Sequence, residues 1–562
     1  MKTYGMIEAT DEGTWKVHAK AHVLIRLKRL FPRVQFNRAG AIELGRTTEI
    51  ARDLEWILDR YPMEMGAEDK ILLQSEARAF VEAEDLAEKI LDGNHRIETL
   101  DWEAKNAEGE TPHADQLVAA DLAIAQGALL IADDLGMGKS LTGLLCFRDS
   151  MKLPAVIVCQ THLPKQWLGE LHDWTPLRGH IARVGSPYNM AEYNDGVTPD
   201  VLILPYSKLA GWAPALRGRV RAVVFDEVQE LRRNTSQKYA AAGMIADSCD
   251  VVVGLTATPI YNYGDEVHNI FSIIRPDALG SREEFIREWG VSYGTHIGVS
   301  DPAGLRHWLE DQHLMVQRTW KDRGIDRPEP EHIPISIDSD EKIMDALTEE
   351  VVDMAELLVS RNASREELFK LSGDFDWKMR RATGIAKARF VAEFVKALCE
   401  QGEQVLLFGW HHDVYEVWRD RLSKYRPVMY TGKQTTPQKD RAKAEFMAGE
   451  AQVMVMSLRA GAGLDGLQER SHICVFGELD WSPGMHQQCL GRLNRGAQEK
   501  RVLGYFLVSD YGTDPMMADV LNLKRQQADG FMNPERELLA AMPDKDRIKR
   551  LAADFLERRG VD

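Results

Sequence analysis

The sequence predicts an α/β protein with two tandem, doubly wound parallel-sheet lobes, preceded by a small α/β unit and followed by a helical tail. Short apolar runs typical of buried strands alternate with helical segments in two separate stretches of the chain. In the first stretch, polar residues directly follow several of these runs, at the strand ends where parallel sheets bind ligands. The length of 562 residues is also too great for one core and predicts several domains.

The composition is that of an ordinary globular protein and narrows the class of function. The formal net charge of -17 argues against a protein that coats nucleic acid non-specifically, although a locally basic groove is compatible with it. The six cysteines are scattered without a C-x-x-C pair, which predicts reduced thiols and no zinc site or disulfide framework. Because no apolar run suits a membrane span or a signal peptide, we expect an intracellular, cytoplasmic protein.

Residues 1–105 are predicted to form the small N-terminal accessory domain. Strand-like runs precede a helical period in which Ile50, Leu54 and Ile57 fall on one face. The basic segment 16–33 is compatible with a nucleic-acid contact, but a solvated helix face is the more ordinary interpretation. An acidic helical stretch and the polar run NAEGETPHAD then predict a linker-like boundary.

The two alternating stretches predict lobe 1 over residues 109–332 and lobe 2 over residues 333–530. The strand-like runs of lobe 1 are ALLIAD, AVIVCQ, VLILPY, AVVFDE and VVVGLTAT. Those of lobe 2 are QVLLFGW, RPVMYTG, AQVMVMSL, HICVFGE and LGYFLVS. A helical insertion is expected over about residues 339–398, and an amphipathic helical tail over residues 531–562.

The strongest chemical signal is ADDLGMGKS, residues 132–140, which joins an apolar strand to a helix-compatible run. It ends as the phosphate-loop pattern G-x-x-x-x-G-K-[ST] ends, but Asp133 stands where the first glycine belongs. In such a loop, backbone N–H groups face phosphate oxygens, Lys139 adds a positive charge and the Ser140 hydroxyl can hold Mg²⁺. An ordinary strand–turn–helix is the alternative.

Two further strand ends carry residues that suit nucleotide hydrolysis. Asp226 could hold the Mg²⁺ that bridges the phosphates, and Glu227 could orient or deprotonate the attacking water. For the pair alone, a solvated acidic turn is the alternative, but its place two strands after the phosphate loop favours catalysis. Thr256 and Thr258 end the next strand and could hydrogen-bond the acidic pair, although such hydroxyls usually mark a plain strand terminus.

Two charged clusters in the second stretch suggest further chemistry. Arg492 and Arg495 lie three residues apart and are neighbours on a helix or tight loop. Arginines that reach a γ-phosphate from a second lobe stabilise the transition state, whereas a solvated pair is the alternative. The run WHHD, residues 410–413, could suggest a metal, but adjacent histidines diverge and no further ligand lies at a suitable spacing.

In this order, the motifs resemble the core of superfamily-two motors, and more narrowly the Swi/Snf-type double-stranded-DNA translocases with two RecA-like lobes. The motifs that carry the resemblance are DDLGMGKS, CQTHLPKQW, LILPYSKLA, DEVQ, GLTATP, LLFGWHHD, SLRAGAGLD and QCLGRLNRGAQ. TGIAKARFVAEFV and VFGELDWSPGMHQQCLGRLNRGAQ are similar to the annealing-helicase branch of that family. The resemblance covers residues from about 109 to about 530, and the Asp133-Asp134 pair becomes part of the translocase pattern.

The resemblance implies a role for each matching residue. The implied ATP-binding residues are Gln116 for adenine, then Asp134, Gly136, Gly138, Lys139 and Ser140. The implied catalytic residues are Lys139, Asp226, Glu227, Arg492 and Arg495, with Ser140 and Asp226 holding Mg²⁺ through ATP. The implied coupling residues are Gln229, Thr256, Thr258 and Gln488, and those facing the DNA backbone are Thr161, Lys165, Ser207 and Arg459.

Three departures from the family pattern leave the catalytic groups in place. Gln229 stands in DEVQ where the family has histidine, and Asn494 and Gly496 are unusual in the last motif. SLRAGAGLDG aligns only with a one-residue shift, which leaves the roles of Gly463 and Asp465 open. We therefore expect an active ATPase rather than an inactive scaffold.

The expected function is an ATP-hydrolysing motor that translocates on double-stranded DNA and remodels DNA or protein–DNA complexes, with ATP and Mg²⁺ as cofactors. A strand-separating helicase is the alternative within enzymes. An ATP-gated remodeller of protein partners, without a nucleic-acid track, is the alternative of another class. We expect a monomer that binds duplex, forked or branched DNA, no membrane association, and a bacterial or phage source.

Overall fold

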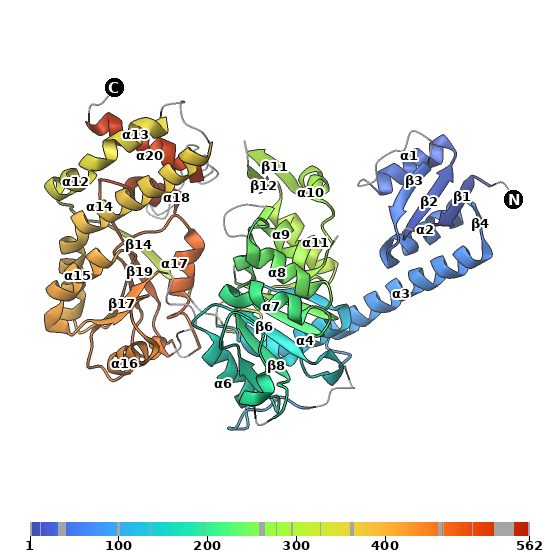
Figure 1. Ribbon diagram of the computed structural model, residues 1–562, viewed down its shortest axis with the longest axis horizontal. Helices are drawn as coiled ribbons and strands as arrows, with labels where there is room; N and C mark the ends of the chain where they lie inside the picture. The colour runs from blue at the N-terminus through green and yellow to red at the C-terminus, as the bar shows by residue number, and fades with distance from the viewer. Residues whose placement is uncertain are drawn as a thin grey trace.

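The computed structural model has a small N-terminal unit and two larger lobes, each built on its own β-sheet (Figure 1). It describes residues 3–559 except 12, 32–40, 98–101, 135, 195, 258–264, 277, 294–295, 326–327, 360–364, 459–463, 465, 497 and 522–543. No helix within those ranges is long and apolar enough to cross a membrane.

The N-terminal unit is a mixed four-stranded sheet in the order β3-β2-β1-β4, covered by helices. Its elements are β1 (Gly5–Ala9), β2 (Thr14–Ala19), α1 (Ala21–Leu30), β3 (Ala41–Gly45), α2 (Thr48–Arg60), β4 (Glu64–Met65) and α3 (Ala67–Leu91). The predicted apolar face of α2 packs in the core through Leu54 and Ile57. The sequence pattern does not predict β4, because a two-residue strand has no measurable period.

The acidic stretch of the predicted boundary, which the sequence analysis expects to be helical, forms the second half of helix α3. Its first half packs in the N-terminal core through Leu73 and Ala77, and its end packs in the core of lobe 1 through Ala87 and Ile90. None of residues 78–86 between them is buried, and the helix crosses this gap as a single rod (Figure 1). Alanine and glutamate are strong helix formers, so the polar stretch forms a rigid connection.

Lobe 1 is a seven-stranded parallel sheet in the order β13-β5-β10-β9-β6-β8-β7, with a hydrophobic core on each face. Its strands are β5 (Ala128–Ile131), β6 (Ala155–Cys159), β7 (Gly179–Ile181), β8 (Val201–Pro205), β9 (Ala222–Asp226), β10 (Val251–Leu255) and β13 (Met315–Val316). Its helices are α4 (Ala114–Gln126), α5 (Lys139–Leu145), α6 (Pro164–Trp174), α7 (Leu209–Leu216), α8 (Gln237–Ala246), α9 (Asp265–Ile274), α10 (Arg282–Trp289) and α11 (Pro302–Asp311). A hairpin of β11 (Gly290–Tyr293) and β12 (His296–Val299) adjoins them.

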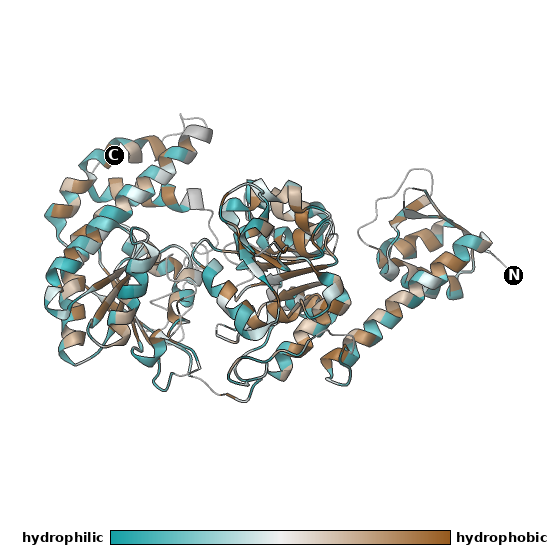
Figure 2. Ribbon diagram, turned by 60° about the horizontal axis from the view of Figure 1, so that its bottom comes forward, coloured by the Kyte–Doolittle hydropathy of each residue, from teal (hydrophilic) through white to brown (hydrophobic). Residues whose placement is uncertain are grey.

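Lobe 2 is a six-stranded parallel sheet in the order β14-β19-β18-β15-β17-β16. Its strands are β14 (Glu331–Ser336), β15 (Val405–Gly409), β16 (Val428–Tyr430), β17 (Val453–Ser457), β18 (Ile473–Phe476) and β19 (Leu503–Val508). Its helices are α12 (Glu341–Thr348), α13 (Val352–Val359), α14 (Arg365–Glu400), α15 (His412–Arg421), α16 (Thr436–Met447), α17 (Pro483–Leu490), α18 (Asp514–Val520) and α20 (Asp544–Arg559). In both lobes the apolar strands lie between layers of helices (Figure 2).

These two parallel sheets confirm the predicted fold class, and each of the ten predicted strand runs contains a strand. Strand β14 pairs with β19 and begins at Glu331, so the sheet of lobe 2 starts two residues before the predicted boundary at 333. Helices α12, α13 and α14 lie in the predicted helical insertion. The tail helix α20 packs on them through Ile548, Leu551 and Ala552. The domain boundaries stay predictions.

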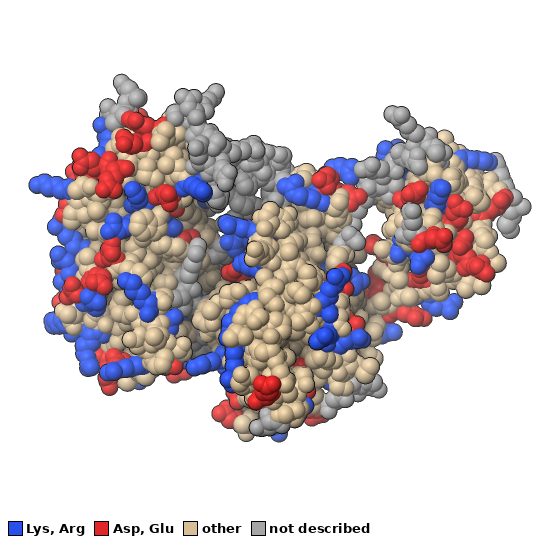
Figure 3. Space-filling view, viewed as in Figure 1, with Lys and Arg blue, Asp and Glu red and all other residues tan. Residues whose placement is uncertain are grey.

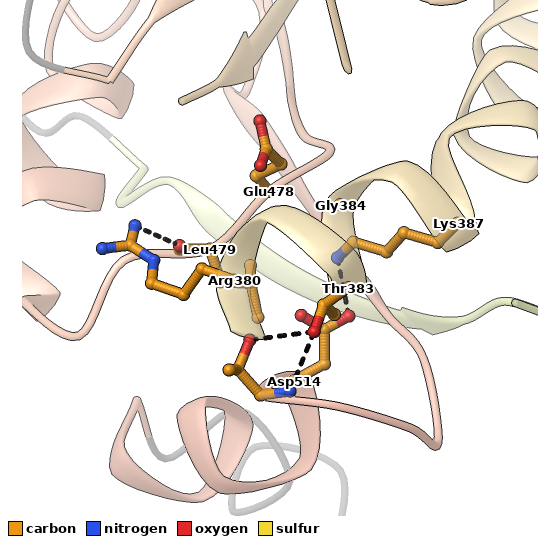
Figure 4. Close-up of a pocket in the computed structure, with 8 residues that line it drawn as sticks. Arg380, Thr383, Gly384, Lys387, Glu478, Leu479 and Asp514 are labelled. Atoms are coloured by element: carbon orange, nitrogen blue, oxygen red, sulfur yellow. Dashed lines mark hydrogen bonds and ion pairs between the residues drawn. The ribbon is translucent and has the colours of Figure 1, made fainter. Parts of the chain in front are cut away.

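A buried polar network fixes α14 against the strand ends of lobe 2 (Figure 4). We call it the α14 network, and its members on α14 are Arg380, Thr383, Gly384 and Lys387. Lys387 Nζ donates to Asp514 at 2.6 Å and to the Leu507 carbonyl at 2.8 Å. Thr383 Oγ1 accepts the backbone N–H of Thr513 at 3.1 Å. The network therefore binds one helix face to the end of β19 and the start of α18.

The same helix face also holds the end of β18. Arg380 donates to the Leu479 carbonyl at 3.0 Å, and Gly384 leaves room for Glu478, which a Cβ at that position would meet. Glu478 accepts the backbone N–H groups of Trp410 and His411 and pairs with His411 Nδ1 at 2.6 Å. His411 is thus engaged by a carboxylate, and the described part of the chain contains no group of three or more metal-ligating side chains.

Candidate active site

The segment that follows β5 has the backbone of a phosphate-binding loop. Gly136 and Gly138 have φ angles of 81° and 78°, a left-handed conformation that glycine adopts without strain. Gly138 is the N-cap of α5, and a Cβ there would lie 2.5 Å from Gln116 Nε2. Both glycines are therefore required by the backbone, and the second one also by the close approach of Gln116.

The ammonium group of Lys139 lies folded against this loop. Its Nζ donates to the carbonyls of Asp133 and Asp134 at 2.7 and 2.9 Å. Burial lowers the pKa of Lys139, and nearby carboxylates, first that of Glu227 and then those of Asp133 and Asp226, oppose this shift. The loop therefore holds one cation among several anions at the point where a nucleotide would add further negative charge.

The acidic pair lies two strands away, at the end of β9. Trp167 Nε1 donates to Asp226 Oδ2 at 2.9 Å. Burial raises the pKa of Asp226 to about 7, and the charge of Glu227 adds to this rise. Glu227 has a φ of 48°, which is strained for a non-glycine residue, and the side-chain amide of Gln229 donates to its carboxylate. The strained turn gives the two adjacent carboxylates different environments.

Two of the predicted coupling residues lie near the acidic pair in lobe 1, and a third lies on lobe 2. The Gln229 Oε1 atom is buried and has no hydrogen-bond partner among the described residues. Thr256 is buried at the end of β10, between β5 and β9, and its N–H donates to the Ile131 carbonyl at 3.0 Å. Thr258 lies outside the described residues, and Gln488 lies partly buried on α17. Their coupling role stays a prediction.

Helix α6 adds two residues to the site that the sequence analysis did not assign. Trp167 holds Asp226, and Glu170 accepts hydrogen bonds from Gln166 Nε2 at 3.0 Å and from the Ser140 hydroxyl. Burial raises the pKa of Glu170. The signal was present in the sequence, since W-x-x-E after a predicted strand places both side chains on one helix face.

The two predicted arginines occupy different places. A Cβ on Gly136 would lie 3.3 Å from Arg495 Cγ, and the Arg495 guanidinium is attracted to Glu170. Arg492 is 3% exposed and hydrogen-bonds the thiol of Cys489, inside lobe 2. The structure therefore brings Arg495 to the phosphate loop, whereas the partners of Arg492 within the described residues belong to its own lobe.

Gln116 is buried and engaged by the protein itself. Its Oε1 accepts the N–H of His113 at 2.9 Å, and its Nε2 donates to the carbonyls of Met137 and Gly138 at 3.2 and 3.1 Å. These bonds tie α4 to the end of the phosphate loop. A contact with adenine stays a prediction and requires that one of these bonds be exchanged.

Three of the residues predicted to face DNA lie at the same edge of the lobe 1 sheet. Thr161 follows β6, Ser207 follows β8, and their hydroxyl oxygens are 3.4 Å apart on the surface. Lys165 is exposed in the first turn of α6. The fourth predicted residue, Arg459, lies outside the described residues, as do Gly463 and Asp465.

Asp133, which stands where the phosphate-loop pattern has glycine, has a structural explanation. Its carboxylate is fully buried and accepts the backbone N–H of Arg318 at 3.1 Å and its Nε at 2.8 Å, with a further bond from the same guanidinium. Arg318 follows β13, the edge strand beside β5. A glycine could not form this pair, so the departure from the pattern serves to anchor the loop.

Comparisons with known proteins agree with this geometry. Residues 51–326 match the family model described as SNF2-related domain. The mouse "DNA annealing helicase and endonuclease ZRANB3" is 22% identical over 438 residues, which cover 74% of this chain and 40% of that protein. The "Uncharacterized ATP-dependent helicase YqhH" of Bacillus subtilis (strain 168) is 22% identical over 455 residues, which cover 73% of this chain and 78% of that protein.

Among solved structures, the "Sulfolobus solfataricus SWI2/SNF2 ATPase core in complex with dsDNA" is 17% identical, with a TM-score of 0.35 and a coverage of 81% of this chain and 99% of that chain. The chain thus spans less than half the length of the annealing helicase that it matches. The family match and the relatives confirm the resemblance drawn from the motifs. The chain therefore contains an SNF2-related domain over residues 51–326, and it is similar to proteins of the SNF2-family ATP-dependent helicase and ATPase class.

Proposed function

We propose that this protein is an ATP-driven motor that moves along double-stranded DNA and remodels DNA or protein–DNA complexes. The observation that carries the proposal is a site to which both lobes contribute. Lys139 and the acidic pair Asp226–Glu227 belong to lobe 1, and Arg495 of lobe 2 lies beside Gly136 of the phosphate loop. A site divided in this way is complete only when the lobes meet, so nucleotide binding and lobe closure favour each other.

In the proposed reaction, each residue acts from its observed place. Lys139 exchanges the loop carbonyls for phosphate oxygens, and Arg495 stabilises charge on the γ-phosphate. Glu227 orients or deprotonates the attacking water. Ser140 and Asp226 are the residues that would hold Mg²⁺, which would supply positive charge to the phosphates when bound. The donor set fits, because a hydroxyl and a carboxylate supply oxygen ligands of the kind that Mg²⁺ prefers, with the carboxylate of Glu227 close by.

Double-stranded DNA is proposed as the track on two grounds. The relative from mouse is named a DNA annealing helicase. In addition, Thr161, Ser207 and Lys165 are exposed at the sheet edge that carries the nucleotide site, where they suit contacts to backbone phosphates. The face of lobe 1 seen in Figure 3 is largely uncharged at its centre and bordered by Lys and Arg side chains, which fits a local cationic border on an acidic protein.

The test measures ATP hydrolysis by the full chain alone and with duplex, forked and single-stranded DNA and with RNA. We expect duplex DNA to stimulate turnover and Glu227→Gln to abolish it with every substrate. Displacement of a triplex-forming strand, without separation of the underlying duplex, then reports translocation. Robust separation of forked DNA would support a helicase instead, and turnover that ignores every nucleic acid would support a remodeller of protein partners.

A further inference from the structure

Residues 315–324 form a strap that joins the phosphate loop to lobe 2. Strand β13, at the start of this strap, pairs with β5, and backbone bonds continue along the loop, from Ala132 N to Val316 O at 2.8 Å and from Asp134 N to Arg318 O at 3.0 Å. Beyond the strap, the chain enters β14, the first strand of the lobe 2 sheet, at Glu331. The strap therefore lies between the site and the moving lobe along the chain.

Two arginines of the strap reach both ends of the phosphate loop. Arg318 forms the buried pair with Asp133, at the start of the loop. Arg323 donates to the carbonyl of Met137, at its end, at 3.1 Å. Both arginines also meet Asp115 of α4, with Arg323 Nη2 at 2.8 Å and Arg318 Nη1 at 3.4 Å from Asp115 Oδ2. Paired guanidinium groups are rigid connectors, because several bonds fix their orientation at once.

Trp320, between these arginines, contacts the middle of the loop. Its backbone N–H donates to the carboxylate of Asp134. Its ring carbon Cζ2 would lie 3.5 Å from a Cβ on Gly136, the same position at which Arg495 Cγ would lie 3.3 Å away. The strap and the arginine of lobe 2 therefore meet at one glycine of the phosphate loop.

We propose that Asp115, Asp133, Arg318 and Arg323 act as positioning residues that couple the phosphate loop to the movement of lobe 2. A movement of lobe 2 that reaches the strap along the chain would either carry the loop with it or break these bonds. Nucleotide binding at the loop is then linked to lobe closure, and closure in turn to nucleotide affinity. This inference rests on the proposed ATP-driven motor and adds the route by which its two lobes communicate.

The test compares two buried ion pairs of similar burial. Asp133→Asn and Arg318→Lys weaken the pair in the strap and keep a hydrogen-bonding group at each position. The matched control is Lys387→Met, which removes the buried partner of Asp514 in the α14 network of lobe 2 and touches no residue of the loop. A second control, Arg178→Ala, removes an exposed ion pair with Asp200 at the far edge of lobe 1.

Three quantities are measured for each variant: the melting temperature, the Kd for a fluorescent ATP analogue, and the stimulation of turnover by duplex DNA. We expect Asp133→Asn and Arg318→Lys to weaken nucleotide affinity and stimulation by about threefold to tenfold, the range of coupling residues. The double variant should lose less than the product of the two single losses, because they remove one interaction. Lys387→Met should lower the melting temperature and leave the Kd for the ATP analogue and the stimulation by duplex DNA unchanged.

A distance measurement keeps the coupling testable without DNA. Met151 of lobe 1 and Ser423 of lobe 2 are exposed, and five of the six native cysteines are buried, so Met151→Cys with Ser423→Cys allows two-site labelling for energy transfer. We expect the ATP analogue to shorten the distance between the labels in the parent protein and to shorten it less in the strap variants. Should the strap variants lower stability but leave affinity, stimulation and closure at parent values, the inference is wrong.

The two proposals fail in different ways. If the parent protein closes on the nucleotide but ignores every nucleic acid, the motor on DNA is wrong and the strap is still judged by affinity and closure. If DNA stimulates the parent and all strap variants equally, the motor stands and the strap has a structural role alone.

Discussion

Both lobes hold the carboxyl ends of their parallel strands with a buried ion pair, yet the two pairs have different surroundings. In lobe 1, Asp133 lies in the segment that carries Lys139, its carboxylate is fully buried, and its partner Arg318 comes from the strap. In lobe 2, Lys387 and Asp514 are equally inaccessible, but they bind a helix to the end of β19. Both lobes use a buried ion pair, but the residues around the two pairs differ.

A buried ion pair is therefore not by itself a sign of function. Such pairs add little net stability relative to apolar residues of the same size, because desolvation offsets their attraction. What they add is a fixed direction for the groups that they join. In lobe 1 that direction is given to the phosphate loop. In lobe 2 it is given to the end of β19 and the start of α18.

The largest expected effect tests which arginine of lobe 2 acts at the nucleotide site of lobe 1. We expect Arg495→Ala to lower turnover by about 10³-fold or more, the range for an arginine that stabilises the phosphoryl transition state. Arg492→Ala should mainly lower the melting temperature, because Arg492 is buried against Cys489. Steady-state hydrolysis at saturating ATP, with thermal unfolding of both variants, separates the two. Equal loss of turnover in two well-folded variants would contradict the difference.

The next effect tests the chemistry of lobe 1 alone. Glu227→Gln should lower turnover by about 10²–10⁴-fold, since it removes the proposed general base. Lys139→Ala should abolish hydrolysis and also weaken nucleotide binding, because it removes the cation of the loop. Single-turnover hydrolysis and binding of a fluorescent analogue report the two steps separately. Turnover at the parent level in both variants would refute the assignment of the site to lobe 1.

A third effect tests the stabilising role of lobe 2. Lys387→Met should lower the free energy of unfolding by about 3–5 kcal/mol, because it leaves the Asp514 carboxylate buried without its cation. The expected measurement is urea unfolding, followed by hydrogen exchange to locate the loss in lobe 2. The double variant with Asp514→Asn should recover part of the loss. If the variant instead lost protection from hydrogen exchange in lobe 1, the two networks would belong to one cooperative unit.

The smallest expected effect is a difference in how acid changes the stability of the two lobes. Burial lowers the pKa of His486 in lobe 2 to about 4, so the folded state binds fewer protons there than the unfolded chain between pH 4 and 6.5, and acid destabilises it. Burial raises the pKa of Asp226 in lobe 1 to about 7. The folded state therefore binds more protons there than the unfolded chain between pH 4 and 7, and acid stabilises it.

Unfolding of the nucleotide-free protein at pH 7 and pH 5 measures this difference. The contribution is at most about 1.4 kcal/mol for each pH unit and each group. We expect His486→Gln to remove the loss of stability in acid in lobe 2. We expect Asp226→Asn to remove the gain of stability in acid in lobe 1. Hydrogen exchange assigns each change to its lobe, and identical pH slopes in the parent and both variants would show that other groups dominate.

Much of the fold and the core of the site follow from local patterns in the sequence. The ten strand runs contain strands of three to six residues, and their alternation with helices allows few arrangements other than two parallel sheets. Asp226 and Glu227 directly end one such run, and Lys139 and Ser140 follow another after a short loop, so their place at one sheet edge is fixed as soon as the strands are parallel. The edge strand β13 is missed, because its two residues carry no period.

Only the tertiary structure decided which side chains meet across long stretches of chain. Asp133 and Arg318 are 185 residues apart, and Lys387 and Asp514 are 127 apart. No spacing rule relates residues at such separations, because their contact depends on how whole elements pack. The sequence by itself determined the loop, the acidic pair and the two lobes. Packing decided that Asp133 is an anchor and that Arg495 is the arginine beside the loop.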